Sequence, residues 1–143
     1  AVLKNVYAMA AGIADGLDFG DNFQSVLISN AVREMKRFIA RTQKLKRNIN
    51  QSAYLGDLLV TAYSKHSRNR QFGYYLAQQI GEEEIKSSMS MVAEGAYAVR
   101  PLYAMARSQE KKLKTPILDA VYQVLVEKKS PKEVFEALKL QLN

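Results

Sequence analysis

The sequence predicts an all-α domain of about six to eight helices. Apolar residues recur at helical spacing along most of the 143 residues, as they do in amphipathic helices. Ser, Thr or Asp precedes several of these segments, twice directly before a proline, which is typical of helix starts. No segment shows the sustained apolar–polar alternation of a strand. We therefore expect one compact helical domain over residues 1–143, a usual length for a single domain.

The first predicted helix, Val2–Leu17, is apolar on nearly every side. Lys4 is its only charged residue before Asp15. Gly12 and Gly16 are expected to weaken it locally. A helix that is apolar all round is usually buried, so this segment is predicted to lie at the centre of the domain.

The next segments are also read from apolar spacing and helix-start signals. Asp21 and Gln24 are spaced as a capping box, and a second helix is expected from there to about Arg41. A polar, basic loop over 44–51 follows, and then a short apolar helix over 53–63.

Capping residues and breakers divide the remainder. Ser67 is expected to open a helix that Gly81 closes, and a further helix over 92–111 contains Pro101, a candidate for a kink. Two more helix starts place a cap directly before an N1 proline: these are Thr115-Pro116 and Ser130-Pro131, the second with Glu133 in capping-box spacing.

Composition limits the classes of function. With 21 basic and 14 acidic residues the formal net charge is +7, which favours an anionic partner but leaves nucleic acid, a phosphorylated metabolite and a membrane surface open. The chain has no Cys and one His, so we predict no metal site. No apolar run approaches the roughly 18 residues of a membrane span, and none is expected. Because the sequence opens inside an apolar helix without Met, we expect it to be a fragment.

Lys4 is the first candidate catalytic residue. On a helix it shares a face with Ala8 and Ala11, whose small side chains allow another element or a ligand to approach closely. Apolar surroundings would partly desolvate the ammonium and make it usable for proton transfer near neutral pH. The alternative, equally favoured by the pattern, is a first-turn lysine that extends to water.

Asp57 is an isolated carboxylate in an apolar helix, so a buried Asp57 would need a partner. Lys4 is the attractive candidate, because the pair would keep Asp57 ionised and fix the ammonium. A plain helix cap after Gly56 is the alternative. Thr61, four residues on, lies on the same helix face and adds a hydroxyl, or bonds back to its own helix.

Ser67, Arg68 and Asn69 form the best candidate anion site. With Ser67 as the N-cap, free backbone N–H groups and the helix dipole favour an anion there. Arg68 can bind a phosphate in bidentate fashion, and Asn69 can donate an amide N–H. The alternative is an ordinary capped helix with solvated arginines.

A basic run without an acid follows Met35. It could track a nucleic-acid backbone, although the end of a helix also favours exposed cations. The absence of interleaved aromatic residues weakens the nucleic-acid interpretation. The run consists of Lys36, Arg37, Arg41, Lys44, Lys46 and Arg47.

The order and spacing of the motifs resemble the carboxyl-terminal half of the NAD(P)-dependent glycerol-3-phosphate dehydrogenase family over essentially the whole chain. The matching motifs are Leu3-Lys4-Asn5-Val6, Gly56-Asp57-Leu58, Val60-Thr61, Ser67-Arg68-Asn69-Arg70, Val92-Ala93-Glu94-Gly95 and Pro116-Ile117.

This resemblance implies a helical substrate-binding and dimerisation domain, whose partner Rossmann domain would bind NAD or NADP. No Gly-x-Gly-x-x-Gly motif stands in these 143 residues. The implied reaction interconverts sn-glycerol 3-phosphate and glycerone phosphate for glycerophospholipid synthesis, in a cytoplasmic homodimer; the fragment alone is expected to be inactive. A helical nucleic-acid-binding module is the alternative function.

The resemblance also implies roles for individual residues. Lys4 matches the catalytic lysine, which exchanges a proton with the substrate oxygen. Lys4, Asp57, Thr61, Ser67, Arg68 and Asn69 match the substrate site, and Arg68, Val92 and Glu94 match positions that touch the cofactor.

Overall fold

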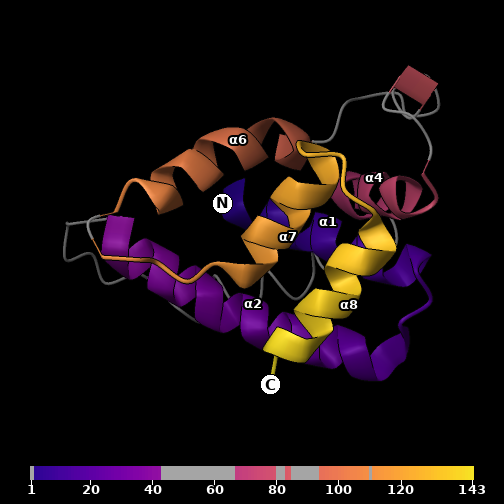
Figure 1. Ribbon diagram of the computed structural model, residues 1–143, viewed down its shortest axis with the longest axis horizontal. Helices are drawn as coiled ribbons and strands as arrows, with labels where there is room; N and C mark the ends of the chain where they lie inside the picture. Colours follow the sequence, from indigo (N-terminus) through magenta and orange to yellow (C-terminus); the bar gives the residue numbers. More distant parts are fainter. Residues whose placement is uncertain (1, 43–66, 80–82, 85–93, 110) are drawn as a thin grey trace.

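A computed structural model describes residues 2–42, 67–79, 83–84, 94–109 and 111–143. Its helices confirm the all-α prediction, and the residues it describes contain no strand (Figure 1). The helices are α1 (Val2–Gly16), α2 (Gly20–Thr42), α4 (Arg68–Ala77), α6 (Glu94–Arg107), α7 (Pro116–Leu125) and α8 (Pro131–Gln141). Among these helices none is long and apolar enough to cross a membrane.

Helix α1 forms the centre of the domain. It contacts α2, α4, α6 and α7, and Figure 1 shows it behind α7, with α6 on one side and α2 on the other. Its middle is completely buried, as the all-round apolar pattern predicts. The residues with no exposed surface are Val6, Ala8, Met9, Ala10, Ala11, Ile13 and Ala14.

The backbones of α1 and α4 touch directly. A Cβ atom at Gly12 would overlap the carbonyl oxygen of Arg70, and one at Gly73 would overlap that of Met9. Glycine at these two positions is therefore a packing requirement rather than a local weakness. The two helices run side by side over their length, and Gln78 at the end of α4 donates a hydrogen bond of 2.8 Å to the carbonyl of Gly16 at the end of α1.

The expected capping box at the start of α2 is wrong. The helix already begins at Gly20, so Asp21 lies in the first turn, where its charge still favours the helix dipole. The Gln24 amide is buried and donates to the carbonyl of Ala11 at 2.8 Å. Gln24 thus fixes α2 against α1 instead of capping its own helix.

Two helices end earlier than predicted. Helix α4 ends at Ala77, with Gln78 as its C-cap, and Gln79 adopts a left-handed φ of 60° that breaks the helix before Gly81. Helix α6 continues through Pro101 but ends at Arg107, short of residue 111. Beyond the end of the helix, the Arg107 guanidinium donates a hydrogen bond of 2.6 Å to the carbonyl of Leu113.

The two proline-marked helices begin as expected, but their caps differ. Ser130 accepts a hydrogen bond from the backbone N–H of Glu133 at 3.4 Å and caps α8 as predicted. Thr115 occupies the N-cap position of α7 without capping it. Its hydroxyl donates instead to the carboxylate of Asp119 at 2.9 Å.

Glu34 takes over the role expected of Thr115. This carboxylate belongs to α2 and has no exposed surface. It accepts hydrogen bonds from the backbone N–H groups of Ile117 (2.8 Å) and Leu118 (3.0 Å) at the start of α7. The hydroxyl of Tyr7, on α1, donates to it at 3.0 Å. One buried side chain therefore joins α1, α2 and α7 and satisfies N–H groups that lack partners within their own helix.

Burial dominates the ionisation of this group. It raises the pKa of Glu34 from its ordinary value of 4.5 to about 7, although the hydrogen bonds from Ile117, Leu118 and Tyr7 act in the opposite direction. Burial, followed by the charge of Glu34, also raises the pKa of Tyr7 well above its ordinary value. The folded protein therefore keeps a proton on Glu34 at pH values where the unfolded chain has released it.

Gly73→Ala tests the close contact of α1 and α4. An exposed helical glycine gains about 1 kcal/mol when replaced by alanine, but here the added methyl group must push the helices apart. Overpacking of this kind costs about 1–3 kcal/mol, so we expect a lower unfolding free energy in urea titrations. The control is Ser29→Ala, on the exposed face of α2, which should change stability little. A Gly73→Ala protein as stable as the parent would contradict the contact.

Glu34→Gln tests the buried carboxylate through its pH dependence. The parent loses stability as the pH rises from about 4.5 to about 7, because the folded state binds more protons than the unfolded state over that range. This interval corresponds to on the order of 3 kcal/mol. The glutamine variant lacks this loss, so its stability relative to the parent should improve between pH 4.5 and pH 7.5. A stability difference independent of pH would mean that Glu34 does not titrate in this range.

Candidate functional site

The structure describes five of the eight predicted site residues. Lys4 lies in the first turns of α1, Ser67, Arg68 and Asn69 form the start of α4, and Glu94 is the first residue of α6. The other three, Asp57, Thr61 and Val92, lie outside the described residues, and so does the predicted pairing of Lys4 with Asp57.

Ser67 caps α4, as the sequence predicts. Its backbone is extended, with φ −62° and ψ 126°, and its hydroxyl oxygen accepts a hydrogen bond from the backbone N–H of Arg70 at 3.3 Å. Arg68 is the first helical residue and is exposed. The start of α4 thus combines a helix N-terminus with an exposed guanidinium, an arrangement that favours an anion.

Asn69 is buried and has a defined orientation. Its Oδ1 accepts a hydrogen bond of 2.8 Å from the backbone N–H of Gly95, in the first turn of α6. Because Oδ1 is committed to α6, the Nδ2 group of the same amide is the donor left for another partner. Gly95 belongs to one of the sequence motifs, but nothing in the sequence predicts its hydrogen bond to Asn69.

Three helix starts converge on Gly95. A Cβ at this position would lie 2.8 Å from Oδ1 of Asn69 and 2.9 Å from the carbonyl oxygen of Asn5. Asn5 follows Lys4, and Asn69 follows Arg68. We call the contact of Asn5, Asn69 and Gly95 the α1–α4–α6 junction; it brings the elements that carry the predicted catalytic, phosphate and cofactor residues to one place.

Lys4 is half-buried, whereas Ala8 and Ala11 further along the helix are fully buried. The lysine therefore lies at the border between the core and the surface of the domain. This position suits both interpretations of the sequence, a partly desolvated ammonium and one that extends to water. Its proton-transfer role stays a prediction.

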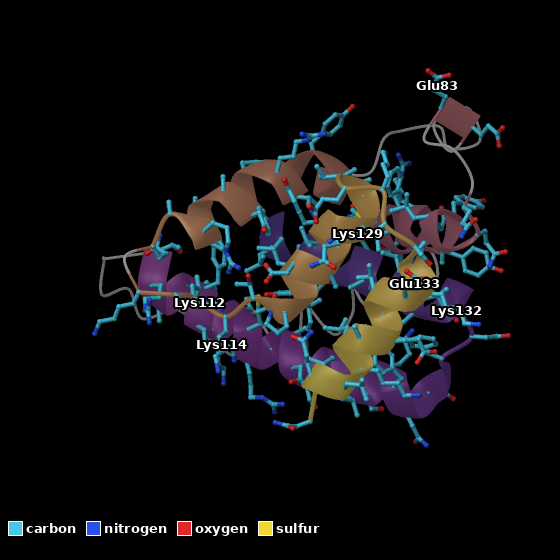
Figure 2. The ribbon with its side chains drawn as sticks, viewed as in Figure 1. Glu83, Lys112, Lys114, Lys129, Lys132 and Glu133 are labelled. Atoms are coloured by element: carbon cyan, nitrogen blue, oxygen red, sulfur yellow. The ribbon has the colours of Figure 1, made fainter. Side chains whose placement is uncertain are left out.

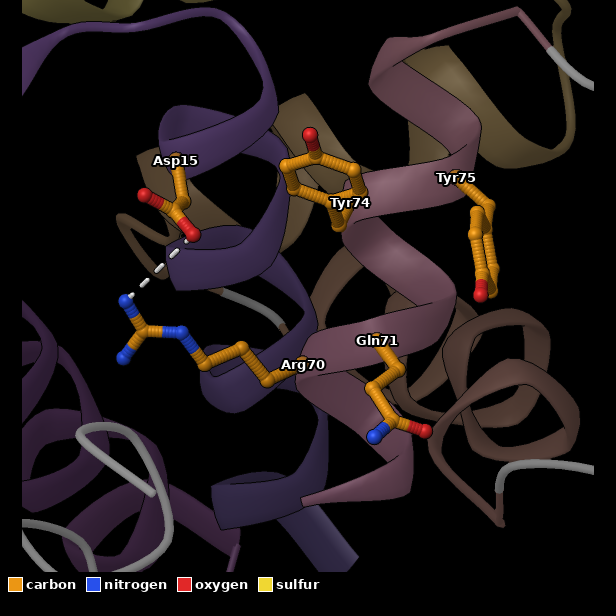
Figure 3. A pocket seen from close by; sticks show the side chains of 5 residues that line it. All are labelled: Asp15, Arg70, Gln71, Tyr74 and Tyr75. Carbon is orange, nitrogen blue, oxygen red and sulfur yellow. Dashed lines mark ion pairs between the residues drawn. The ribbon is translucent and has the colours of Figure 1, made fainter. Parts of the chain in front are cut away.

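Helix α4 also borders a cavity whose described lining contains none of the predicted site residues. Arg70 is mostly buried and forms an ion pair with Asp15 of α1, with 3.8 Å between Nη2 and Oδ2 (Figure 3). The pair borders this cavity of about 300 Å³, which Gln71, Tyr74 and Tyr75 also line. Since a carboxylate already accompanies its guanidinium, this cavity is a poor anion site.

The arrangement defines an all-α domain with a central apolar helix. The first turn of that helix carries a lysine, and it meets the capped start of a helix that carries an arginine. The family model described as NAD-dependent glycerol-3-phosphate dehydrogenase C-terminus matches residues 1–136. The chain belongs to this family, as the sequence motifs indicate.

Individual relatives agree with this assignment. The chain is 42% identical over 141 residues to a glycerol-3-phosphate dehydrogenase [NAD(P)+] of Chlamydia pneumoniae, and 40% identical over 139 residues to one of Salinibacter ruber. A crystal structure of glycerol-3-phosphate dehydrogenase from Coxiella burnetii superposes with a TM-score of 0.85 at 30% identity.

These matches cover nearly all of this chain but only part of each relative. The shares are 99% of this chain and 41% of the Chlamydia protein, 94% and 39% for the Salinibacter protein, and 96% and 42% for the Coxiella chain. The chain therefore spans about two fifths of the length of the relatives it matches.

Proposed function

We propose that this chain is the substrate domain of an enzyme that interconverts sn-glycerol 3-phosphate and glycerone phosphate with NAD or NADP. The observation that carries the proposal is the α1–α4–α6 junction, where a lysine-bearing helix start meets a capped, cationic one. Membership of the family supports the same chemistry. The cofactor-binding half of the enzyme would be a separate Rossmann domain, which these 143 residues do not contain.

In this proposal the start of α4 holds the substrate phosphate. Arg68 is exposed and cationic, Asn69 has Nδ2 available as a donor, and Ser67 fixes the first turn so that its N–H groups keep a constant direction. Charge-assisted hydrogen bonds from a guanidinium are among the stronger polar contacts in proteins. The phosphate group thereby sets the position of the three-carbon substrate.

Lys4 acts on the oxygen of the reacting carbon. During reduction it gives its proton to the oxygen of glycerone phosphate as that oxygen gains charge, and during oxidation it accepts the hydroxyl proton of glycerol 3-phosphate. Asp57 is proposed to hold the ammonium in place, and Thr61 to add a hydroxyl to the substrate site.

We also propose that a dinucleotide cofactor binds at the edge of this site. The exposed guanidinium of Arg68 suits its phosphates, and Val92 and Glu94 are proposed to contact it. When bound, the nicotinamide supplies or takes up the hydride. The residues of this chain orient the substrate and move its proton.

We extend the proposal to the assembly and its setting. Among the described residues, four large apolar side chains are exposed, Tyr74, Tyr97, Met105 and Leu140, and they are available for contact with a second copy or with the cofactor domain. A homodimer that works in the cytoplasm and supplies glycerophospholipid synthesis agrees with the family. Nothing in the fold or in the comparisons supports the nucleic-acid-binding alternative.

Lys4→Ala, made in the full-length enzyme, tests the proton transfer. A positioned proton donor contributes roughly 10²–10⁴-fold to the rate, so kcat should fall by about that factor while the unfolding transition stays unchanged. Lys132→Ala, an exposed lysine on α8, serves as the control and should retain full activity. Near-normal turnover in Lys4→Ala would remove Lys4 from the chemistry.

Asn69 allows the phosphate role to be separated from the structural role. Asn69→Asp keeps an oxygen for the Gly95 N–H but loses the donor and adds a negative charge, so KM for the phosphorylated substrate should rise. The buried charge also lowers the unfolding free energy, so KM is measured at a temperature where the variant is fully folded. Asn69→Ala also leaves the buried N–H unpaired, which costs about 1–3 kcal/mol of unfolding free energy.

Arg68→Ala provides the comparison at the exposed side of the same site. It should weaken substrate binding by about 1.5–3 kcal/mol without lowering the unfolding free energy. If KM for substrate and cofactor stays at the parent value in both Asn69→Asp and Arg68→Ala, the phosphate is not bound at the start of α4.

A further inference from the structure

A cationic cavity, separate from the one beside Arg70, lies where the end of α2 meets the segment that precedes α7. Its volume is about 380 Å³, and four of the residues that line it are basic. Among the residues that the structure describes, no acidic residue and no residue of α1, α4 or α6 lines it. The lining consists of Arg37, Ala40, Arg41, Lys112, Leu113 and Lys114.

The two arginines of this cavity are held in place by backbone oxygens. Arg37 donates from Nε (3.3 Å) and Nη2 (3.1 Å) to the carbonyl of Lys114. Arg41, one turn further on the same face of α2, donates from Nη1 to the carbonyl of Lys111 at 3.0 Å. A guanidinium carries five N–H donors, so each arginine keeps donors beyond those that hold it. The arginine positions are fixed by the fold before any ligand binds.

Two described acidic groups near these cations, Glu34 and Asp119, have partners outside the cavity. Glu34, one turn before Arg37, is buried and accepts two hydrogen bonds from the start of α7 and one from Tyr7 of α1. Asp119, which interacts electrostatically with Lys112, forms an ion pair with Arg107 at 3.3 Å. The cavity thus differs from the one beside Arg70, where Asp15 accompanies the guanidinium.

We propose that this cavity binds the phosphate group of an anionic ligand. Two guanidinium forks and two ammonium groups suit a group with several negative oxygens, because arginine binds phosphate in bidentate fashion and lysine adds a point charge. The cavity is large enough for a phosphate with an attached small group. The inference is independent of the proposed reaction, since the cavity contains none of the residues assigned to the substrate or cofactor.

The basic run in the sequence supplies two of the four basic residues of this cavity. Arg37 and Arg41 belong to it, and they are exposed on α2 together with Lys36; Lys44, Lys46 and Arg47 lie outside the described residues. The fold adds the other two by placing Lys112 and Lys114 along α2 (Figure 2).

Lys112→Gln/Lys114→Gln tests the site with little risk to the fold. Both side chains are exposed, and the carbonyl oxygens that hold Arg37 and Arg41 belong to the backbone. The matched control, Lys129→Gln/Lys132→Gln, removes the same charge near the start of α8, away from the cavity in Figure 2. Ala40→Glu is a second variant that places a carboxylate in the cavity.

The measurement is calorimetric titration of the full-length protein with pyrophosphate, in the Arg68→Ala background so that the start of α4 does not contribute. We expect binding that weakens at least about tenfold in both cavity variants, which is the effect of losing one or more charge-assisted contacts, and that is retained in the control. No binding in the parent, or equal weakening in the control, would overturn the proposal.

Flotation with vesicles identifies the source of the phosphate. Vesicles of phosphatidylcholine with phosphatidylglycerol are compared with phosphatidylcholine alone. Pyrophosphate binding without flotation supports a free phosphate ester, and pyrophosphate binding with cavity-dependent flotation supports a lipid headgroup. Flotation without pyrophosphate binding would indicate diffuse surface charge and contradict a discrete site.

Discussion

The direct backbone contact between α1 and α4 determines how closely the elements of the proposed site approach one another. Gly12 and Gly73 allow the two helices to approach without side chains between them, and the starts of both helices therefore reach Gly95 together. A larger separation would move Lys4 away from the capped start of α4. The apolar surface of α1, buried on all sides, favours this arrangement through the hydrophobic effect, and the glycines decide how close the elements come.

Polar groups inside the domain give the packing its specific register. Glu34 joins α1, α2 and α7 through Tyr7 and two backbone N–H groups, and Asn69 joins α4 to α6 through Gly95. A buried polar group that loses its partner is expensive, so each of these contacts disfavours a shifted arrangement of the helices. The same side chain of Asn69 is proposed to contact the substrate, which links the stability of the junction to the geometry of the site.

The sequence predicted the fold class and the central position of α1, because apolar periodicity and all-round apolarity report on neighbours close in the chain. It placed the Ser67 and Ser130 caps correctly for the same reason. It failed at Thr115, whose capping role is taken by Glu34, 83 and 84 residues from its backbone partners. Two further features also join segments that are distant in the sequence, so no local pattern predicts them. They are the Asn69–Gly95 contact and the cationic cavity. Family motifs identified the candidate residues but not the contact that brings their helices together.

The proposed site requires the start of α4, beside the start of α1, to hold the phosphate of a three-carbon substrate in reach of Lys4. A crystal structure of the full-length enzyme with cofactor and glycerol 3-phosphate tests it most directly. We expect phosphate oxygens within hydrogen-bond distance, about 2.7–3.2 Å, of Arg68 and of Nδ2 of Asn69. We also expect Nζ of Lys4 at the hydroxyl of the reacting carbon. A phosphate bound away from α4, or a Lys4 ammonium that does not reach that hydroxyl, would contradict it.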